Sequence, residues 1–239
     1  MRSAAPDGGR PPWAARAAGA ALAAGIAAIG AVRGPRPIHT TGLLLTGRLH
    51  WSARGATRSG ITWIDELPEG EVVVTARLSR GAALPARLPD VIGLAVRPGT
   101  GDGVCDLLLS STGIGVPGRF LLLPRWTPAR AVLSTLMPYR GTEGPVLIAA
   151  RSKAEVLPAR MEALRAVFAH SPWHLELLFA TPTGLWHRFA ELELAPAEGP
   201  IDADVPRFDP VLRPPPGAGT YAWTRALRER AYVTGRRSR

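Results

Sequence analysis

The chain has 239 residues, of which 46% are hydrophobic and 20% are charged, a balance typical of a globular protein. That length suits one large domain. The formal net charge of +10 favours anionic ligands such as phosphate esters, nucleic acid or acidic lipid surfaces. Because Cys105 is the only cysteine, an internal disulfide and a thiolate metal cluster are both excluded.

The positive charge comes almost entirely from arginine, since Lys153 is the only lysine, and this usage is typical of a GC-rich genome. Arginines are scattered along every segment and become dense only in the tail from Arg225 to Arg239. The tail carries no recognisable nucleic-acid motif. We therefore expect no nucleic-acid partner.

Residues 1–35 are expected to form a flexible leader and an Ala/Gly-rich helix, and residues 36–239 the folded domain. Within the leader, Ala17–Val32 carries no charge. This run is shorter than the roughly 20 apolar residues that a bilayer span needs, and alanine and glycine are only weakly apolar. We expect no membrane span and a cytoplasmic location; a signal peptide or membrane anchor is the alternative.

From residue 42 onward the sequence shows short alternating or β-branched stretches separated by Gly/Pro turns, the pattern of antiparallel strands. About eight such strands predict a closed antiparallel barrel, because closure removes sheet edges that would pair with other chains. The fold class is therefore α+β, mainly β. The expected strands are Gly42–Trp51, Glu71–Ser79, Val91–Arg97, Val104–Ser110, Arg119–Leu123, Pro145–Arg151, Trp173–Thr181 and Leu185–Leu194.

Two helices are expected outside the barrel. Pro158–His170 has an apolar face at helical spacing. Residues 197–219 are rich in proline and predict a loop, and Thr220–Tyr232 predicts a terminal helix.

Two pairs of residues have a spacing that suggests chemistry. Arg36 is a permanent cation three residues before His39, whose imidazole exchanges a proton near neutral pH. Arg228 and Tyr232 stand four apart and share one face of the predicted helix. A guanidinium beside a phenol favours the phenolate, which is the form that binds ferric iron.

These pairs resemble motifs of the haem catalases, in particular of small catalase-related peroxidases. The segment Phe208-Asp209-Pro210 and the Arg228-x-x-x-Tyr232 spacing are similar to the end of that family, where the motif carries the proximal haem ligand. Arg36-x-x-His39-x-x-Gly42 is similar to the motif of the distal histidine.

Further segments occur in the family's order. Val74–Ser79 resembles the strand whose arginine meets a haem propionate, and Pro89–Val96 resembles the strand that follows. Asp106–Leu109 resembles the strand before the distal asparagine, but Ser110-Ser111 stands where that asparagine is expected. The loop Thr112–Gly118 lacks the Pro-Phe-Phe run of full catalases.

The resemblance implies a haem-dependent catalase or peroxidase that binds haem b and acts on hydrogen peroxide or an organic peroxide, and a homodimer is the expected assembly. The alternative is a catalase-fold protein without haem turnover, such as a phosphodiesterase-type hydrolase or a haem-binding or interaction module. The resemblance implies an iron ligand in Tyr232, further cofactor contacts in Arg36, Arg77, Arg228 and Arg239, and catalytic groups in His39 and Ser111.

Overall fold

The computed structural model describes residues 42–52, 57–68, 70–99, 104–199, 201 and 208–224. Those up to Thr220 belong to one compact unit, Ile38–Thr220, and Tyr221–Thr224 belong to a second unit, so the two are described separately. In the second unit, residues 222–224 form a helical turn in which the Thr224 hydroxyl donates to the Tyr221 carbonyl at 2.7 Å. The predicted helix Thr220–Tyr232 therefore begins too early, because Thr220 pairs with Tyr139 in the short strand β10 (Gly219–Thr220) and Tyr221 is not helical. Residues 225–232 of that helix and the expected boundary after residue 35 lie outside the described residues.

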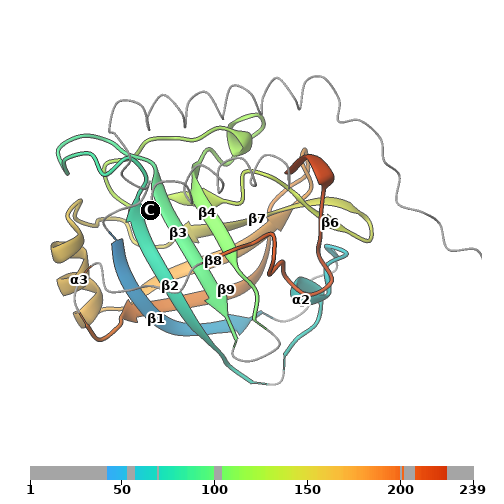
Figure 1. Cartoon of the computed structure of the whole chain (residues 1–239), viewed down its shortest axis with the longest axis horizontal. Helices are drawn as coiled ribbons and strands as arrows, with labels where there is room; N and C mark the ends of the chain where they lie inside the picture. Colours follow the sequence, from blue (N-terminus) through green and yellow to red (C-terminus); the bar gives the residue numbers. More distant parts are fainter. Residues whose placement is uncertain are drawn as a thin grey trace, which may run out of the picture. The chain divides into compact units, whose positions relative to one another are not determined.

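The first unit is built around a closed barrel of eight antiparallel strands (Figure 1). The order around the barrel is β7-β5-β4-β3-β2-β1-β9-β8, and β8 pairs with β7 to complete the ring. The predicted closed antiparallel barrel is therefore confirmed. The strands are β1 (Gly42–Trp51), β2 (Val72–Arg80), β3 (Ile92–Pro98), β4 (Leu107–Thr112), β5 (Val132–Ser134), β7 (Gly144–Ser152), β8 (Trp173–Ala180) and β9 (His187–Pro196).

Several short elements lie outside the eight-stranded ring. β6 (Tyr139–Gly141) and β10 (Gly219–Thr220) extend the sheet beyond β7, and α2 (Thr62–Asp65) and the 3-10 helix η2 (Gly118–Phe120) lie in loops. α3 (Met161–His170) confirms the predicted helix and buries Met161, Leu164 and Phe168. The Phe168 ring stacks on Trp173 of β8 with 5.4 Å between centroids.

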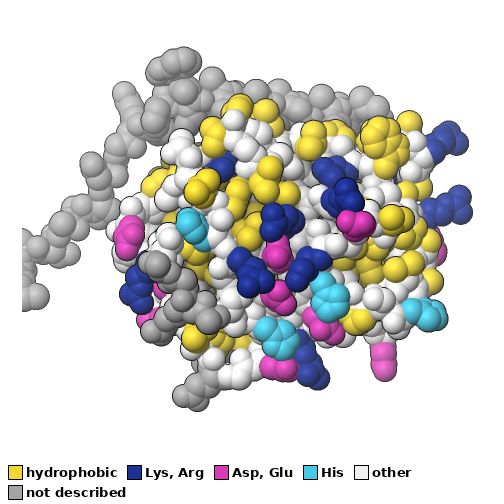
Figure 2. All heavy atoms as spheres, turned by 180° about the vertical axis from the view of Figure 1, so that it is seen from behind, with side chains coloured by type: hydrophobic (Ala, Val, Ile, Leu, Met, Phe, Trp, Pro, Cys, Tyr) yellow, Lys and Arg dark blue, Asp and Glu magenta, His cyan; other side chains and the backbone are white. Residues whose placement is uncertain are grey.

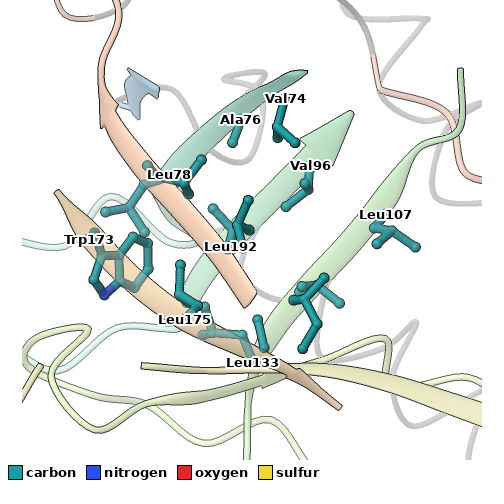
Figure 3. Packing of buried hydrophobic residues seen from close by; sticks show 14 of the residues in the cluster. Val74, Ala76, Leu78, Val96, Leu107, Leu133, Trp173, Leu175 and Leu192 are labelled. Atoms are coloured by element: carbon teal, nitrogen blue, oxygen red, sulfur yellow. The ribbon is translucent and has the colours of Figure 1, made fainter. Parts of the chain in front are cut away.

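The interior of the barrel is filled with apolar side chains. Alternate residues of each strand point inward, as the pleat requires, and Figure 3 shows such side chains from β2, β3, β4, β5, β8 and β9. Leu78, Leu94 and Leu107 are at most 1% exposed. The barrel is thus a packed core, and a ligand site must use its outer face or its loops.

One predicted strand, Arg119–Leu123, is wrong. η2 and a single bridge between Thr112 and Leu122 occupy that segment, and the strand between β4 and β7 is the short β5. The physical reason is Arg119, which is only 4% exposed and donates to carbonyls of another loop instead of continuing a strand. Proline at 117 and 124 further limits regular pairing.

Substitution of Gly47 in β1 tests how closely the main chains of β1 and β9 approach each other. A Cβ built on Gly47 collides with the main-chain carbonyl oxygen of Glu193, which cannot move as a side chain would. We expect Gly47→Ala to lower the free energy of unfolding by about 1–3 kcal/mol, the usual cost of overpacking. Gly115→Ala is the control, because its Cβ meets nothing within 4 Å. Urea unfolding measures both; equal effects would contradict the close approach.

Cys105 is buried, and burial raises the pKa of its thiol to about 12. Since the thiolate is the reactive form, the native protein should not react with a disulfide reagent at about pH 8. The thiol should react at once after unfolding in urea. Stoichiometric labelling of the folded protein within minutes would contradict this burial.

Candidate functional site

A row of small residues crosses the outer face of four neighbouring strands. The register places Gly42 of β1 opposite Ser79 of β2, Ser79 opposite Gly93 of β3, and Gly93 opposite Ser110 of β4. The residues that precede or follow them in sequence, among them Leu43, point into the core. These four positions, called here the small-residue row, lie on the outward-facing side of the strands; Gly42, Ser79 and Gly93 are buried and Ser110 is partly exposed.

Arg77 lies beside this row. It is paired with Leu44 of β1 and Ala95 of β3, one outward position along from Ser79. A Cβ added to Gly42 would meet the Arg77 Cζ at 2.5 Å, so the guanidinium lies across the position where β1 lacks a side chain. The absence of a side chain at Gly42 therefore makes room for a cation at the edge of the row.

The two serines of β4 face opposite ways. Ser110 belongs to the small-residue row and is partly exposed. Ser111 pairs with the core residue Leu133 and is 0% exposed. Its hydroxyl accepts a hydrogen bond from the Ile92 N–H at 3.0 Å and donates one to the Leu123 carbonyl at 2.7 Å. The structure thus places Ser110, rather than the predicted Ser111, on the same face as Arg77.

The other predicted site residues, Arg36, His39, Arg228, Tyr232 and Arg239, lie outside the described residues. Of the seven predicted positions the structure locates Arg77 and Ser111, and it does not bring these two together. The assigned roles, the homodimer and the cytoplasmic location stay predictions. Ser110 could have been chosen from the sequence by strand alternation, because it differs by three positions from the buried Leu107.

A buried acidic cluster stands at the opposite end of β4. The Asp106 carboxylate is 0% exposed and accepts hydrogen bonds from Arg97 Nε at 2.6 Å and from the Asp209 main-chain N–H at 2.7 Å. The hydrogen bond to Asp106 raises the pKa of Arg97. The Arg97 guanidinium also lies 4.9 Å from the Phe208 ring centroid. Asp106 thus fastens the Phe208-Asp209 segment to the barrel.

The described residues hold no group of three or more His, Cys, Asp or Glu side chains that are placed to share a metal ion. Among these same residues, no helix combines the length and apolar character that crossing a bilayer requires.

Removing the Asp106 charge tests the fastening of the Phe208-Asp209 segment. Asp106→Asn leaves a mostly buried Arg97 without its carboxylate, so the free energy of unfolding should fall by about 3 kcal/mol. Glu71→Gln is the matched control, because the exposed Arg48–Glu71 pair should contribute less than about 1 kcal/mol. Calorimetry measures both. Equally small losses of unfolding free energy in both variants would mean that Asp106 does not stabilise the Phe208-Asp209 segment.

Comparison with known proteins identifies the fold. No protein-family model matches the chain, and no curated protein matches it. Among solved structures it is similar to a bacterial catalase (TM-score 0.55, 15% identity, 100% of this chain and 63% of that one). It is also similar to catalase A from Saccharomyces cerevisiae (TM-score 0.59, 11% identity, 91% and 63%).

A fungal catalase gives a third likeness, with a TM-score of 0.58 and 13% identity over 89% of this chain and 61% of that one. The chain thus spans less than two thirds of the length of the catalases that it matches. At such identities the likeness concerns the backbone alone. The chain is a divergent protein with the catalase fold.

Proposed function

We propose that this protein binds haem b on the outer face of the barrel and acts on hydrogen peroxide or an organic peroxide. The observation that carries it is the small-residue row beside Arg77, on a fold shared with catalases. The packed interior leaves this outer face as the available wall. The sequence resemblance adds His39 as a base and Tyr232 as an anionic ligand for the iron.

The described residues suit haem in shape and charge. A flat ring could approach Gly93 and Ser110 closely, because neither carries a long side chain. The Arg77 guanidinium covers Gly42 at the end of the row. A guanidinium pairs with a carboxylate through parallel hydrogen bonds, which is what a ring bearing propionates offers. In this proposal Arg77 holds a propionate at the edge of the row.

The remaining roles follow from the sequence resemblance, and side-chain chemistry supports them. Bound haem supplies the redox chemistry of iron. Tyr232 donates its phenolate oxygen to the metal, and Arg228, together with Arg36 and Arg239, supplies positive charge around the ligand and the propionates. His39 takes a proton from one peroxide oxygen and returns it to the other. Ser110 offers a hydroxyl on the Arg77 face, where the family has an amide.

Haem uptake separates binding from chemistry. Purified protein supplied with haem should show a strong absorption band near the blue edge of the visible. Tyr232→Phe should abolish or greatly weaken this band, because a phenyl ring has no oxygen to give the iron. Arg77→Gln should weaken uptake less, since it removes one propionate partner only. If the wild-type protein takes up no haem, the proposal is wrong.

Peroxide turnover tests the distal side. His39→Ala should keep the haem band and lower turnover by about two to four orders of magnitude, the usual worth of a positioned acid-base group. Ser110→Asn should raise turnover, because it restores a fixed amide donor on the Arg77 face. Ser111→Asn is the control and should destabilise the fold without this gain, since its site is fully buried. Haem binding without turnover in all variants would favour the haem-binding module.

A further inference from the structure

Three loops that hydrogen bonds link to one another expose most of the large apolar side chains found on the surface of the described residues; the β2–β3 and β4–β5 loops leave one end of the barrel, and the β8–β9 turn leaves the other. They span residues 81–90, 113–126 and 181–186, and together they are called here the apolar rim. Trp126 is 60% exposed, Leu121 59% and Leu185 79%. Isolated exposed apolar residues are ordinary, but a concentration of them marks an interaction surface. The remaining exposed members are Leu88, Ile114, Val116, Phe120, Leu122 and Leu123.

Two buried arginines join these loops into one surface. Arg80, 6% exposed, donates to the carbonyl of Leu88 in the first loop and, at 3.1 Å, to that of Trp126 in the second. Arg119 of the second loop donates to the carbonyls of Thr181 at 2.9 Å and of Gly184 at 3.0 Å in the third. Each guanidinium therefore bridges two loops.

Arg119 forms no ion pair with a carboxylate in the part of the chain that the structure describes. Its guanidinium lies 4.9 Å from the Trp186 ring centroid, and the Trp186 indole N–H donates to the Ile114 carbonyl at 2.8 Å. Burial lowers the pKa of Arg119. Burying a cation is costly unless its donors are satisfied, so these contacts hold the rim in one shape. The exposed apolar side chains are thereby presented on a fixed frame.

The main chain of the second loop is also fixed. The Leu123 N–H donates to the Ser111 carbonyl at 2.8 Å, and Leu122 bridges to Thr112 at the end of β4. The Asp90 and Arg125 main chains bridge the first two loops. Because the backbone is engaged in these bonds, the side chains of this loop point outward from a rigid support.

The basic charge of the rim favours an anionic partner over a second copy of the chain. The three loops contain Arg87, Arg119 and Arg125 but only one acid, Asp90, which is buried and 3.8 Å from Arg80 Nε. Elsewhere basic and acidic side chains alternate, as Figure 2 shows near the middle of the face that it views. A second copy of the chain meeting this rim symmetrically would bring arginine against arginine with no acid to pair.

We propose that the apolar rim docks the protein on an anionic lipid surface. Leucine, isoleucine and phenylalanine side chains enter the region between headgroups and acyl chains, and tryptophan favours that same interface. Arg87 and Arg125 pair with lipid phosphates. The rim thus supplies both of the contributions that peripheral membrane binding combines, buried apolar area and basic charge.

Vesicle binding of the full chain tests this surface. The protein should co-sediment with phosphatidylcholine vesicles that contain about a third phosphatidylglycerol, and much less with phosphatidylcholine alone. Leu121→Gln with Leu123→Gln should weaken binding about tenfold or more, because two buried leucines are lost. Leu212→Gln is the apolar control: it is 76% exposed but lies beside Asp209, at the other end of β4.

Charge and position are tested separately. Arg87→Gln should weaken binding to anionic vesicles about fivefold, the usual worth of one interfacial arginine. Arg58→Gln removes the same charge from an exposed position outside the rim and should change binding less than about twofold. Emission from Trp126, obtained as the difference between the wild type and Trp126→Phe, should shift to the blue with anionic vesicles.

Membrane docking is excluded if the wild-type protein ignores anionic vesicles. It is also excluded if the leucine and Arg87 variants bind as well as the wild type, since binding would then come from elsewhere, such as the basic tail. A concentration-dependent dimer that the leucine variants abolish would instead identify a second copy as the occupant. Circular dichroism should show all variants folded, because each change is at an exposed position.

Discussion

Closure of the barrel by the β7–β8 pairing is the constraint on which the rest of this structure depends. Once the ring closes, every inward residue must fill a fixed interior, and residues such as Leu45 and Leu192 are 0–1% exposed as a result. No strand can then bend away to enclose a ligand without opening the ring. Polar chemistry is consequently confined to the outer face and to the loops at the two ends.

Buried charges hold those two ends, and they do so differently. At one end Asp106 gathers N–H donors from Arg97 and from the main chain of Asp209. At the other end Asp90 accepts from the main-chain N–H groups of Ala82 and Leu84, while Arg80 donates to the Trp126 carbonyl. Arg119 links the β4–β5 loop to the carbonyl of Thr181 in the β8–β9 turn. Because a buried charge is costly unless its hydrogen bonds are made, each cluster fixes loops that have little regular structure of their own.

Strand alternation explains why much of the fold could be predicted from the sequence. Long strands such as β1 and β9 show enough alternation or flanking turn residues to be recognised, and so does α3 by its apolar face. β5 was not predicted because its three residues are too few to show a periodicity. Phe120–Leu123 was mistaken for part of a strand because it is apolar. The sequence could not show that the Arg119 guanidinium donates a hydrogen bond to the Thr181 carbonyl, since that contact depends on the tertiary fold.

For a related reason, the sequence did not show which face of the sheet is occupied by Arg77 and by Ser111, the two predicted site residues that the structure locates. A shift of one residue along a strand moves a side chain to the other face, so choosing Ser111 over Ser110 separated the predicted donor from Arg77. The order of the family motifs along the chain indicates which strand carries the donor, but not which face of the sheet the donor side chain occupies. Register supplies the face, because Ser110 pairs with Gly93 and Ser111 pairs with Leu133.

Chain connectivity links the proposed haem face to the apolar rim. Ser79 belongs to the small-residue row, and the next residue, Arg80, holds the first two rim loops together. Ser110 and the loop from Gly113 are related in the same way along β4. A ligand on the outer row and a lipid surface on the rim would therefore meet at the same end of the barrel.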